Sequence, residues 1–267
     1  MRCERGVAFV TIDHPPVNLF DATLIGEMAR LADALAADEA IRVVVLESAD
    51  PDFFIAHADV ALIQRLPTRV DAAPPAPNVF QQMTERFRTM PKATIAKVEG
   101  RARGGGSELV LACDMRFGAL GRAVLGQPEV ALGIIPGGGG TQRLPRLIGR
   151  ARALEIVLGC DDVPADVAER WGYLDRALPP DELGPFVERL AFRIASFPAH
   201  AIALAKASVD AALAPLEAGL VHEDRAFTAT LGADETRRRM QAFLDAGGQT
   251  RAGELDLGRV MEALRAT

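Results

Sequence analysis

The stretch GRARGGGSELVLACDMRF, from Gly100 to Phe117, places three consecutive glycines directly before a run typical of a helix. Glu108 falls within the first turn of that run. A backbone without Cβ atoms lets a ligand approach closely, and the first N–H groups of a helix are unpaired donors at the positive end of its dipole. The pattern predicts a site for a carbonyl oxygen that becomes negative during a reaction, with a carboxyl group one turn away.

A packing explanation competes with this one, because glycines also allow a helix to lie close to a strand. In that case Glu108 would face solvent and interact favourably with the positive end of the helix dipole. A second segment, LGQPEVALGIIPGGGGTQRL (Leu125 to Leu144), repeats the combination of Glu129 and a glycine run before a helix. Neither segment has the glycine and lysine spacing of a P-loop or of a dinucleotide-binding turn. The two segments together favour a shared catalytic site.

Composition narrows the class of protein. The chain has 267 residues, is 49% hydrophobic and 25% charged, and carries a net charge of −6. It can bury one large core, and it lacks the concentrated basic face that binding to nucleic acid requires. Three cysteines do not make a closed disulfide framework, and no apolar run reaches the length of a membrane span. We therefore expect a cytoplasmic protein with no nucleic-acid or membrane partner.

Periodicity predicts an α/β body. Its strands are expected at 7–12, 42–46 and 93–98, with helices at 22–37, capped by Asp21, and at 79–90, after a proline-rich loop at 71–78. Beyond about residue 180 strand signals stop, and helices are expected at 182–196, 199–212, 216–231, 234–245 and 254–264. The change of class predicts a helical tail that packs on its own body or on a neighbouring subunit.

Four segments, in order, carry a resemblance to a known family. They are FFIAHADV (53–60), GRARGGGSELVLACD (100–114), LGQPEVALGIIPGGGGTQRL (125–144) and AERWGYLDRALP (168–179), the last matching a strand that follows a helical hairpin. Over nearly its whole length the chain resembles the crotonase superfamily, the enoyl-CoA hydratase/isomerase group, and most of all its hydratases with two glutamates. The resemblance implies a spiral of ββα units with a CoA-thioester site at 1–195 and a C-terminal helical oligomerisation region with an extended tail at 196–267.

The resemblance also assigns roles to residues. It implies that the amides of Ala58 and Gly105 form the oxyanion hole, that Glu108 activates a water molecule and that Glu129 exchanges the α-proton. Further residues that the resemblance suggests for substrate binding are Ala56, His57, Asp59, Gly104, Pro128 and Gly137. His57 is a pocket-lining proton carrier or a structural hydrogen-bonding group, and Asp59 is expected to cap a helix that begins near Val60.

The implied activity is that of a lyase of fatty acid metabolism, which adds water to a 2-enoyl-CoA to give a 3-hydroxyacyl-CoA. Alternatives within the same superfamily are an enoyl-CoA isomerase or an acyl-CoA thioester hydrolase, and from another class a non-catalytic acyl-CoA binding oligomer. No metal or cofactor is expected, because coenzyme A is part of the substrate. The family implies a homotrimer or homohexamer.

Some positions depart from the family pattern. Two lysines that relatives commonly use near coenzyme A are replaced by Ala61 and by Ala246 in AFLDAGG. Arg101 and Arg103 are candidates to supply replacement charge, since an arginine fork suits phosphate. The tail from Ala246 onward adds a glycine-containing turn and the last expected helix, which is predicted to extend an oligomer contact or the roof of the site.

Overall fold

The computed structural model describes residues 1–63, 65–66 and 77–212, together with 234, 238, 241–242 and 245–247. The chain divides into two compact units, Met1–Ala195 and Ser196–Thr267. In the second unit the described helix is α9 (Ala199–Ala211). The described residues of the candidate site lie in the first unit.

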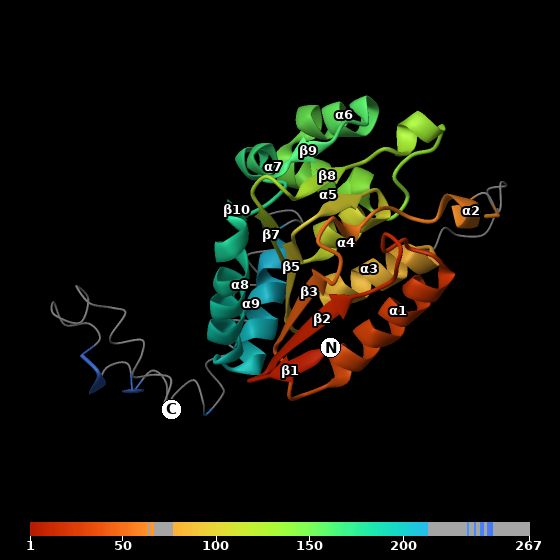
Figure 1. Cartoon of the computed structure of the whole chain (residues 1–267). Coiled ribbons are helices and arrows are strands. Elements are labelled where there is room, and N and C mark those ends of the chain that lie inside the picture. Colours follow the sequence, from red (N-terminus) through yellow and green to blue (C-terminus); the bar gives the residue numbers. More distant parts are fainter. Residues whose placement is uncertain are drawn as a thin grey trace. The chain divides into compact units, whose positions relative to one another are not determined.

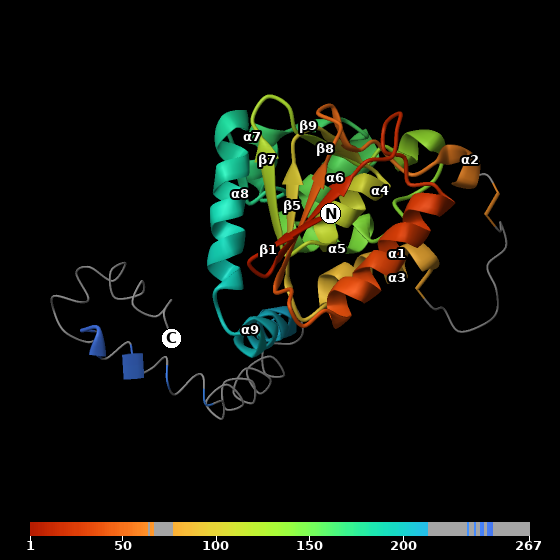
Figure 2. The same ribbon diagram turned by 60° about the horizontal axis from the view of Figure 1, so that its bottom comes forward.

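A six-stranded sheet forms the base of the first unit. Its strands, in spatial order, are β1 (Arg2–Glu4), β2 (Val7–Ile12), β3 (Val43–Ser48), β5 (Ala93–Val98), β7 (Met115–Ala119) and β10 (Arg176–Leu178). Apart from the antiparallel pair β1–β2, neighbouring strands are parallel. Helix α8 (Pro180–Ala195) lies on one face, and α1 (Ala22–Ala37) and α3 (Val79–Thr89) lie on the other (Figures 1 and 2). Strand β3 is apolar and buried because both faces of the sheet are covered.

A second, four-stranded sheet has the order β4 (Phe53–Ile55), β6 (Arg101–Arg103), β8 (Val124–Gly126) and β9 (Val163–Pro164). Strands β3, β5 and β7 of the large sheet are each followed directly by β4, β6 and β8 of the small one, in the same spatial order. After each pair come helices: α2 (Val60–Ile63) and α3, then α4 (Gly105–Ala112), then the 3-10 helix η1 (Glu129–Leu132) and α5 (Gly140–Ile148). This repetition is the spiral of ββα units that the family resemblance implied.

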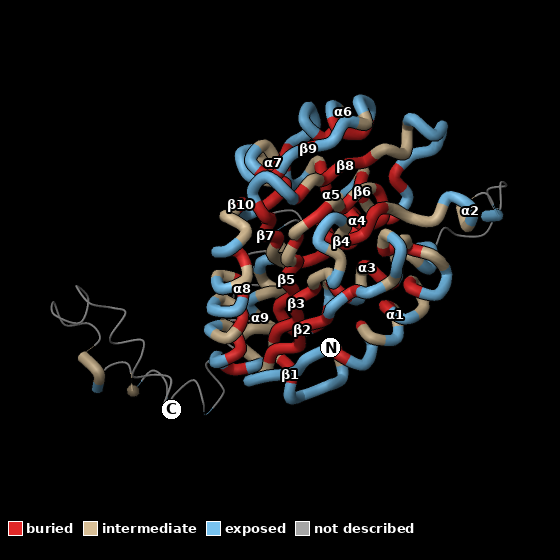
Figure 3. Tube along the Cα trace, in the orientation of Figure 1, coloured by how far each residue is buried: buried red, intermediate tan, exposed pale blue. Residues whose placement is uncertain are grey.

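The spiral decides where the site can lie. Strands β4, β6 and β8 run parallel, so their carboxyl ends share one edge of the small sheet. Ala58, Gly104 and Glu129 all follow these ends within a few residues. Three segments that are far apart in the sequence therefore meet above α4, all eight of whose residues are buried (Figure 3).

Most predicted elements of the first unit are confirmed. Strands β2 and β5 and helix α1 have the predicted bounds, and Asp21 caps α1 by accepting a hydrogen bond from the amide of Leu24 at 2.8 Å. The segment 168–179 contains the end of α7 (Ala165–Trp171), which follows α6 (Arg150–Gly159), and then β10. Helices 182–196 and 199–212 correspond to α8 and α9. The helices expected at 216–231 and 254–264, and 71–76 of the loop, lie outside the described residues, as does most of 234–245.

Candidate active site

The three glycines make a sharp turn from β6 into α4. Gly104 has a φ of 49°, which favours glycine, and its amide donates to the carbonyl of Gly126 at 3.0 Å. A Cβ on Gly106 would overlap the carbonyl oxygen of Ile55 in β4. The packing explanation of the glycines is confirmed, and it is compatible with the catalytic one, because close packing of α4 on β4 brings Gly105 to the edge where the three segments meet.

Two backbone amides face this edge without an acceptor. A bridge with Phe20 uses the carbonyl of His57 and the amide of Asp59, each at 3.0 Å, so the amide of Ala58 between them points the other way. A Cβ built on Gly105 would lie 3.5 Å from the Cβ of Ala58. Within the described ranges neither the Ala58 nor the Gly105 amide has a hydrogen-bond acceptor. Two neighbouring N–H groups without acceptors are what an oxyanion hole requires.

Glu108 is held rigidly in α4 with 3% of its surface exposed. Its Oε1 accepts hydrogen bonds from the amides of Gly138 at 2.7 Å and Gly140 at 2.8 Å. Burial raises the pKa of the Glu108 carboxyl, while the two amides and the charge of Arg143 act in the opposite direction. The second oxygen, Oε2, lies so close to Gly138 that a Cβ there would overlap it. One oxygen is thus fixed by backbone donors, and the other accepts no hydrogen bond from the described residues.

Glu129 approaches the same edge from η1. Its Oε1 lies 2.9 Å from the position of a Cβ on Gly104, which places the carboxyl beside the turn that presents Gly105. Burial, and then the negative charge of Glu108, raise the pKa of Glu129 to about 7. A carboxyl group that still holds its proton near neutral pH can act as a general acid. The two glutamates therefore form an interacting pair with unequal surroundings.

The other predicted site residues lie around the same edge, and their roles in binding stay predictions. His57 donates from Nδ1 to the carbonyl of Ala58 at 2.8 Å, and Asp59 accepts from the amide of Ala61 at 2.8 Å at the start of α2. The carbonyl of Gly137 accepts from the side chains of Asn78 and Gln81 in the first turn of α3. Ala56 lies just after β4, and Pro128 precedes η1. The contact of His57 is the structural one of its two alternatives.

Two phenylalanines that the sequence did not single out bound the site. Phe20 and Phe80 pack edge to face, with ring centroids 5.1 Å apart. The tip of the Phe80 ring lies 3.3 Å from the position of a Cβ on Gly105, and the same ring crowds Gly138. The capping box formed by Asn78 and Gln81 fixes the start of α3 and so the position of Phe80. The Asn78–Gln81 spacing of a capping box is the local signal in the sequence that could have located this helix start.

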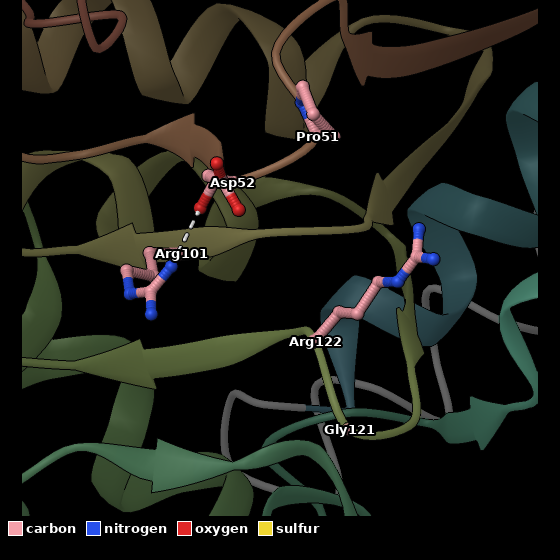
Figure 4. A pocket seen from close by; sticks show the side chains of 5 residues that line it. All are labelled: Pro51, Asp52, Arg101, Gly121 and Arg122. Atoms are coloured by element: carbon pink, nitrogen blue, oxygen red, sulfur yellow. Dashed lines mark hydrogen bonds between the residues drawn. The ribbon is translucent and has the colours of Figure 1, made fainter.

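The two arginines near the glycines lie in different surroundings. Arg103 forms two bonds to Asp162, Nε to Oδ1 at 2.6 Å and Nη2 to Oδ2 at 2.5 Å, so its fork is already occupied. Arg101 begins β6 and lines a separate cavity of about 410 Å³ with Pro51, Asp52, Gly121 and Arg122 (Figure 4). These residues precede β4 and β8 at the strand ends opposite to Gly104. The pairing with Asp162 leaves the Arg103 fork no free edge for a phosphate, whereas a role of Arg101 near coenzyme A stays a prediction.

No cluster of three or more His, Cys, Asp or Glu side chains in the described ranges could hold a metal ion. No helix in that part of the chain has the length and apolar character needed to cross a bilayer.

This spiral, with paired amides facing two carboxyl groups, is the fold of the crotonase superfamily. A family profile described as enoyl-CoA hydratase/isomerase matches residues 2–250, and the chain belongs to that family. It is 34% identical to a protein named crotonyl-CoA hydratase from Syntrophomonas wolfei, over 91% of this chain and 93% of that one. It is also 31% identical to a short-chain-enoyl-CoA hydratase from Clostridium acetobutylicum, over 91% and 92%.

Solved structures lead to the same family. The crystal structure of an enoyl-CoA hydratase from Bacillus anthracis superimposes with a TM-score of 0.83 at 31% identity, over 90% of this chain and 93% of that one.

Proposed function

We propose that this protein is an enoyl-CoA hydratase, which adds water across the C2–C3 double bond of a 2-enoyl-CoA to give a 3-hydroxyacyl-CoA. The observation that carries the proposal is the unequal pair of glutamates beside two unpaired amides. Addition of water needs a base for the water, an acid for the α-carbon and stabilisation of an enolate oxygen. The residues at the edge of the small sheet supply one group for each need.

The amides of Ala58 and Gly105 would bind the thioester oxygen. As the oxygen of water bonds to C3, the double-bond electrons move toward C2 and the carbonyl, and negative charge grows on that oxygen. N–H donors that are already in place stabilise this charge without rearranging, and loss of one such donor typically costs about 2.7 to 4 kcal/mol. Phe80 beside Gly105 would help to exclude bulk water from this interaction.

The glutamates would divide the proton transfers. In the ionised form Glu108, with Oε1 held by two amides, accepts a proton from water through Oε2. Glu129, with its pKa raised to about 7, gives its proton to C2. One proton enters Glu108 and one leaves Glu129, so the resting state returns when a proton passes from the first to the second. Because the groups interact, their titrations are those of a pair.

Further parts of the proposal concern the setting of the reaction. Coenzyme A would enter only as part of the substrate, with no separate cofactor, and the protein would act in the cytoplasm. Replacement of two lysines by Ala61 and Ala246 would weaken, without abolishing, recognition of coenzyme A phosphates, since an exposed charge pair contributes about 0 to 1 kcal/mol. We also propose a homotrimer or homohexamer, which light scattering of the purified protein would test.

The first test follows the loss of the conjugated-thioester absorbance of crotonyl-CoA, with identification of the product. The expected result is rapid formation of the 3-hydroxyacyl-CoA by the wild type and losses of orders of magnitude in both Glu108→Gln and Glu129→Gln. Activity that survives Glu108→Gln but not Glu129→Gln would point to the isomerase. Release of free coenzyme A would point to the hydrolase. Binding of enoyl-CoAs without turnover, unchanged in either variant, would point to a non-catalytic binding protein.

A further inference from the structure

Three buried polar side chains connect the interior of the first unit to Glu129. Tyr173, Ser107 and Gln127 are each 0% exposed. The Tyr173 hydroxyl forms a hydrogen bond with Oγ of Ser107, and the amide of Gln127 lies 3.2 Å from the same Oγ. On its other side the Gln127 amide lies next to the carboxyl of Glu129. The hydratase mechanism proposed above gives no role to any of the three.

The Gln127 amide fits its surroundings in two orientations. In one, its nitrogen donates to Oγ of Ser107 at 3.2 Å and its oxygen faces Glu129. In the other, with oxygen and nitrogen exchanged, the nitrogen donates to both carboxyl oxygens of Glu129, at 3.2 and 3.1 Å, and the amide oxygen accepts from Oγ of Ser107 at 3.2 Å. Hydrogen-bonding needs of the neighbours decide between the two orientations.

The hydroxyl hydrogens select the second orientation. Burial raises the pKa of Tyr173, so its hydroxyl keeps its hydrogen. When Tyr173 donates to Ser107, the hydrogen of Ser107 still needs an acceptor, and in the described part of the chain only the amide oxygen of Gln127 can serve. The reverse orientation leaves that hydrogen unpaired and, once Glu129 has given its proton to C2, sets an amide oxygen against a carboxylate. Both arrangements are costly in a buried site.

We propose that Ser107 and Tyr173 are positioning residues, which turn the Gln127 amide so that its nitrogen donates to Glu129 and aligns that carboxyl group for proton exchange at the α-carbon. This inference rests on the proposed hydratase function. The direction of the hydrogen bonds runs from Tyr173 to Ser107, then to Gln127, and ends at Glu129. Neither hydroxyl touches the substrate in this arrangement.

This hydrogen-bonded relay of Tyr173, Ser107 and Gln127 predicts the direction in which the pKa of Glu129 changes when the relay is broken. Donation from Gln127 favours the ionised form of Glu129, so its loss should raise the pKa of that carboxyl further above 4.5. Other titratable groups near Glu129 are the carboxylate of Glu108, the imidazole of His57, the thiol of Cys160 against η1 and the phenol of Tyr173, while the guanidinium of Arg143 acts on Glu108. Apart from Tyr173, none of these groups changes when the Ser107 hydroxyl is removed.

The test is the pH profile of hydration in Ser107→Ala. Protonated Glu129 is the acid, so hydration declines as pH rises through its pKa. We expect this alkaline decline to move to higher pH by roughly half a unit to one unit. A shift of that size corresponds to the free energy of about one hydrogen bond. We expect kcat to fall roughly three- to tenfold with KM unchanged, because the carboxyl is less well aligned. Tyr173→Phe should shift the profile less, in the same direction. Ser107→Thr keeps a hydroxyl at this position and should have the profile of the wild type.

A double-mutant cycle separates positioning from general damage. Because Ser107 acts through Gln127, Ser107→Ala should shift the profile in the wild type and leave it unchanged in a Gln127→Met background. Thr94→Val removes another fully buried hydroxyl, one that accepts from the amide of Asp114 in the large sheet, and should not move the profile. Equal shifts in both backgrounds, no shift in the wild type, or a matching shift in Thr94→Val would each overturn the proposal. If Ser107→Ala does not fold, Tyr173→Phe carries the same cycle.

A second readout does not depend on turnover. The carboxyl infrared band that disappears in Glu129→Gln reports the protonation of Glu129 directly, and Ser107→Ala should raise the pH at which it titrates. If the wild type hydrates no enoyl-CoA yet this titration shifts, the hydratase proposal fails and the relay stands. If the wild type hydrates crotonyl-CoA and neither readout moves, the relay alone fails.

Discussion

The segments that carry Glu108 and Glu129 differ in almost every physical respect. Helix α4 has all eight residues buried, whereas η1 is a single 3-10 turn with no buried residue. Glu108 is held by two backbone amides, but Glu129 carries a pKa of about 7 and meets the amide of Gln127. One chemical group is thus suited to two tasks by its surroundings, a fixed proton acceptor in the core and a proton donor at the rim.

The largest expected effect comes from removing either carboxyl. Glu108→Gln and Glu129→Gln should each lower kcat for hydration by about 10² to 10⁴, the usual worth of a positioned acid or base. The two losses should not add, because both groups serve one transition state. Steady-state kinetics of the double variant checks this, and a full product of the two single losses would show that the glutamates act independently.

The contrast in burial predicts unequal effects of two similar truncations. Leu109→Ala in α4 removes a fully buried side chain and should lower the free energy of unfolding by about 2 to 5 kcal/mol. Leu132→Ala in η1 removes a side chain that is 59% exposed, and it should cost less than about 0.5 kcal/mol. Urea denaturation of both variants measures the difference. Similar losses would contradict the contrast between core and rim.

A single methyl group should disturb the fixed carboxyl without unfolding the chain. A Cβ at Gly138 would overlap Oε2 of Glu108 and the ring of Phe80, so Gly138→Ala should displace the base and lower kcat roughly ten- to a hundredfold. A Cβ on Gly184 in α8 would meet no atom within 4 Å. Gly184→Ala is therefore the matched control and should leave kcat within about twofold. Equal losses in the two variants would argue against a specific effect on Glu108.

The raised pKa of Glu129 predicts a smaller effect, on stability. The folded chain keeps this proton up to about pH 7, against an ordinary value of 4.5, so the free energy of unfolding contributed by this group falls as pH rises between those values. Glu129→Gln removes this decline. After allowance for solvent screening, we expect the variant to be about 1 to 2 kcal/mol more stable than the wild type at pH 8 and similar at pH 4. Thermal unfolding at both pH values checks the sign, and equal stability at pH 8 would contradict it.

Much of the spiral could be predicted because it depends on local patterns. Apolar β-branched runs mark β2, β3 and β5, and helical spacing with a capping aspartate marks α1. The positions of the paired amides and of both glutamates followed from four motifs in a fixed order. Their roles in the reaction stay predictions until the assays above are done.

The remaining features depend on residues that meet only in the folded chain. Nothing local in the sequence relates Tyr173 to Ser107, which are 66 positions apart, and a glutamine before a proline gives no sign that it faces Glu129. Arg103 was a candidate for phosphate binding because an arginine fork suits phosphate. Only the structure shows that its guanidinium is paired with Asp162. Long-range pairing of polar side chains is the part of a site that periodicity does not encode.

The contact between Gly106 and the backbone of Ile55 has a consequence for protein engineering. It leaves no room for even one methyl group between α4 and β4, so the spacing of the Ala58 and Gly105 amides is set by main chain against main chain. Directed evolution toward new acyl groups should therefore accumulate changes along Phe80 and η1, and should leave this junction untouched in every active descendant.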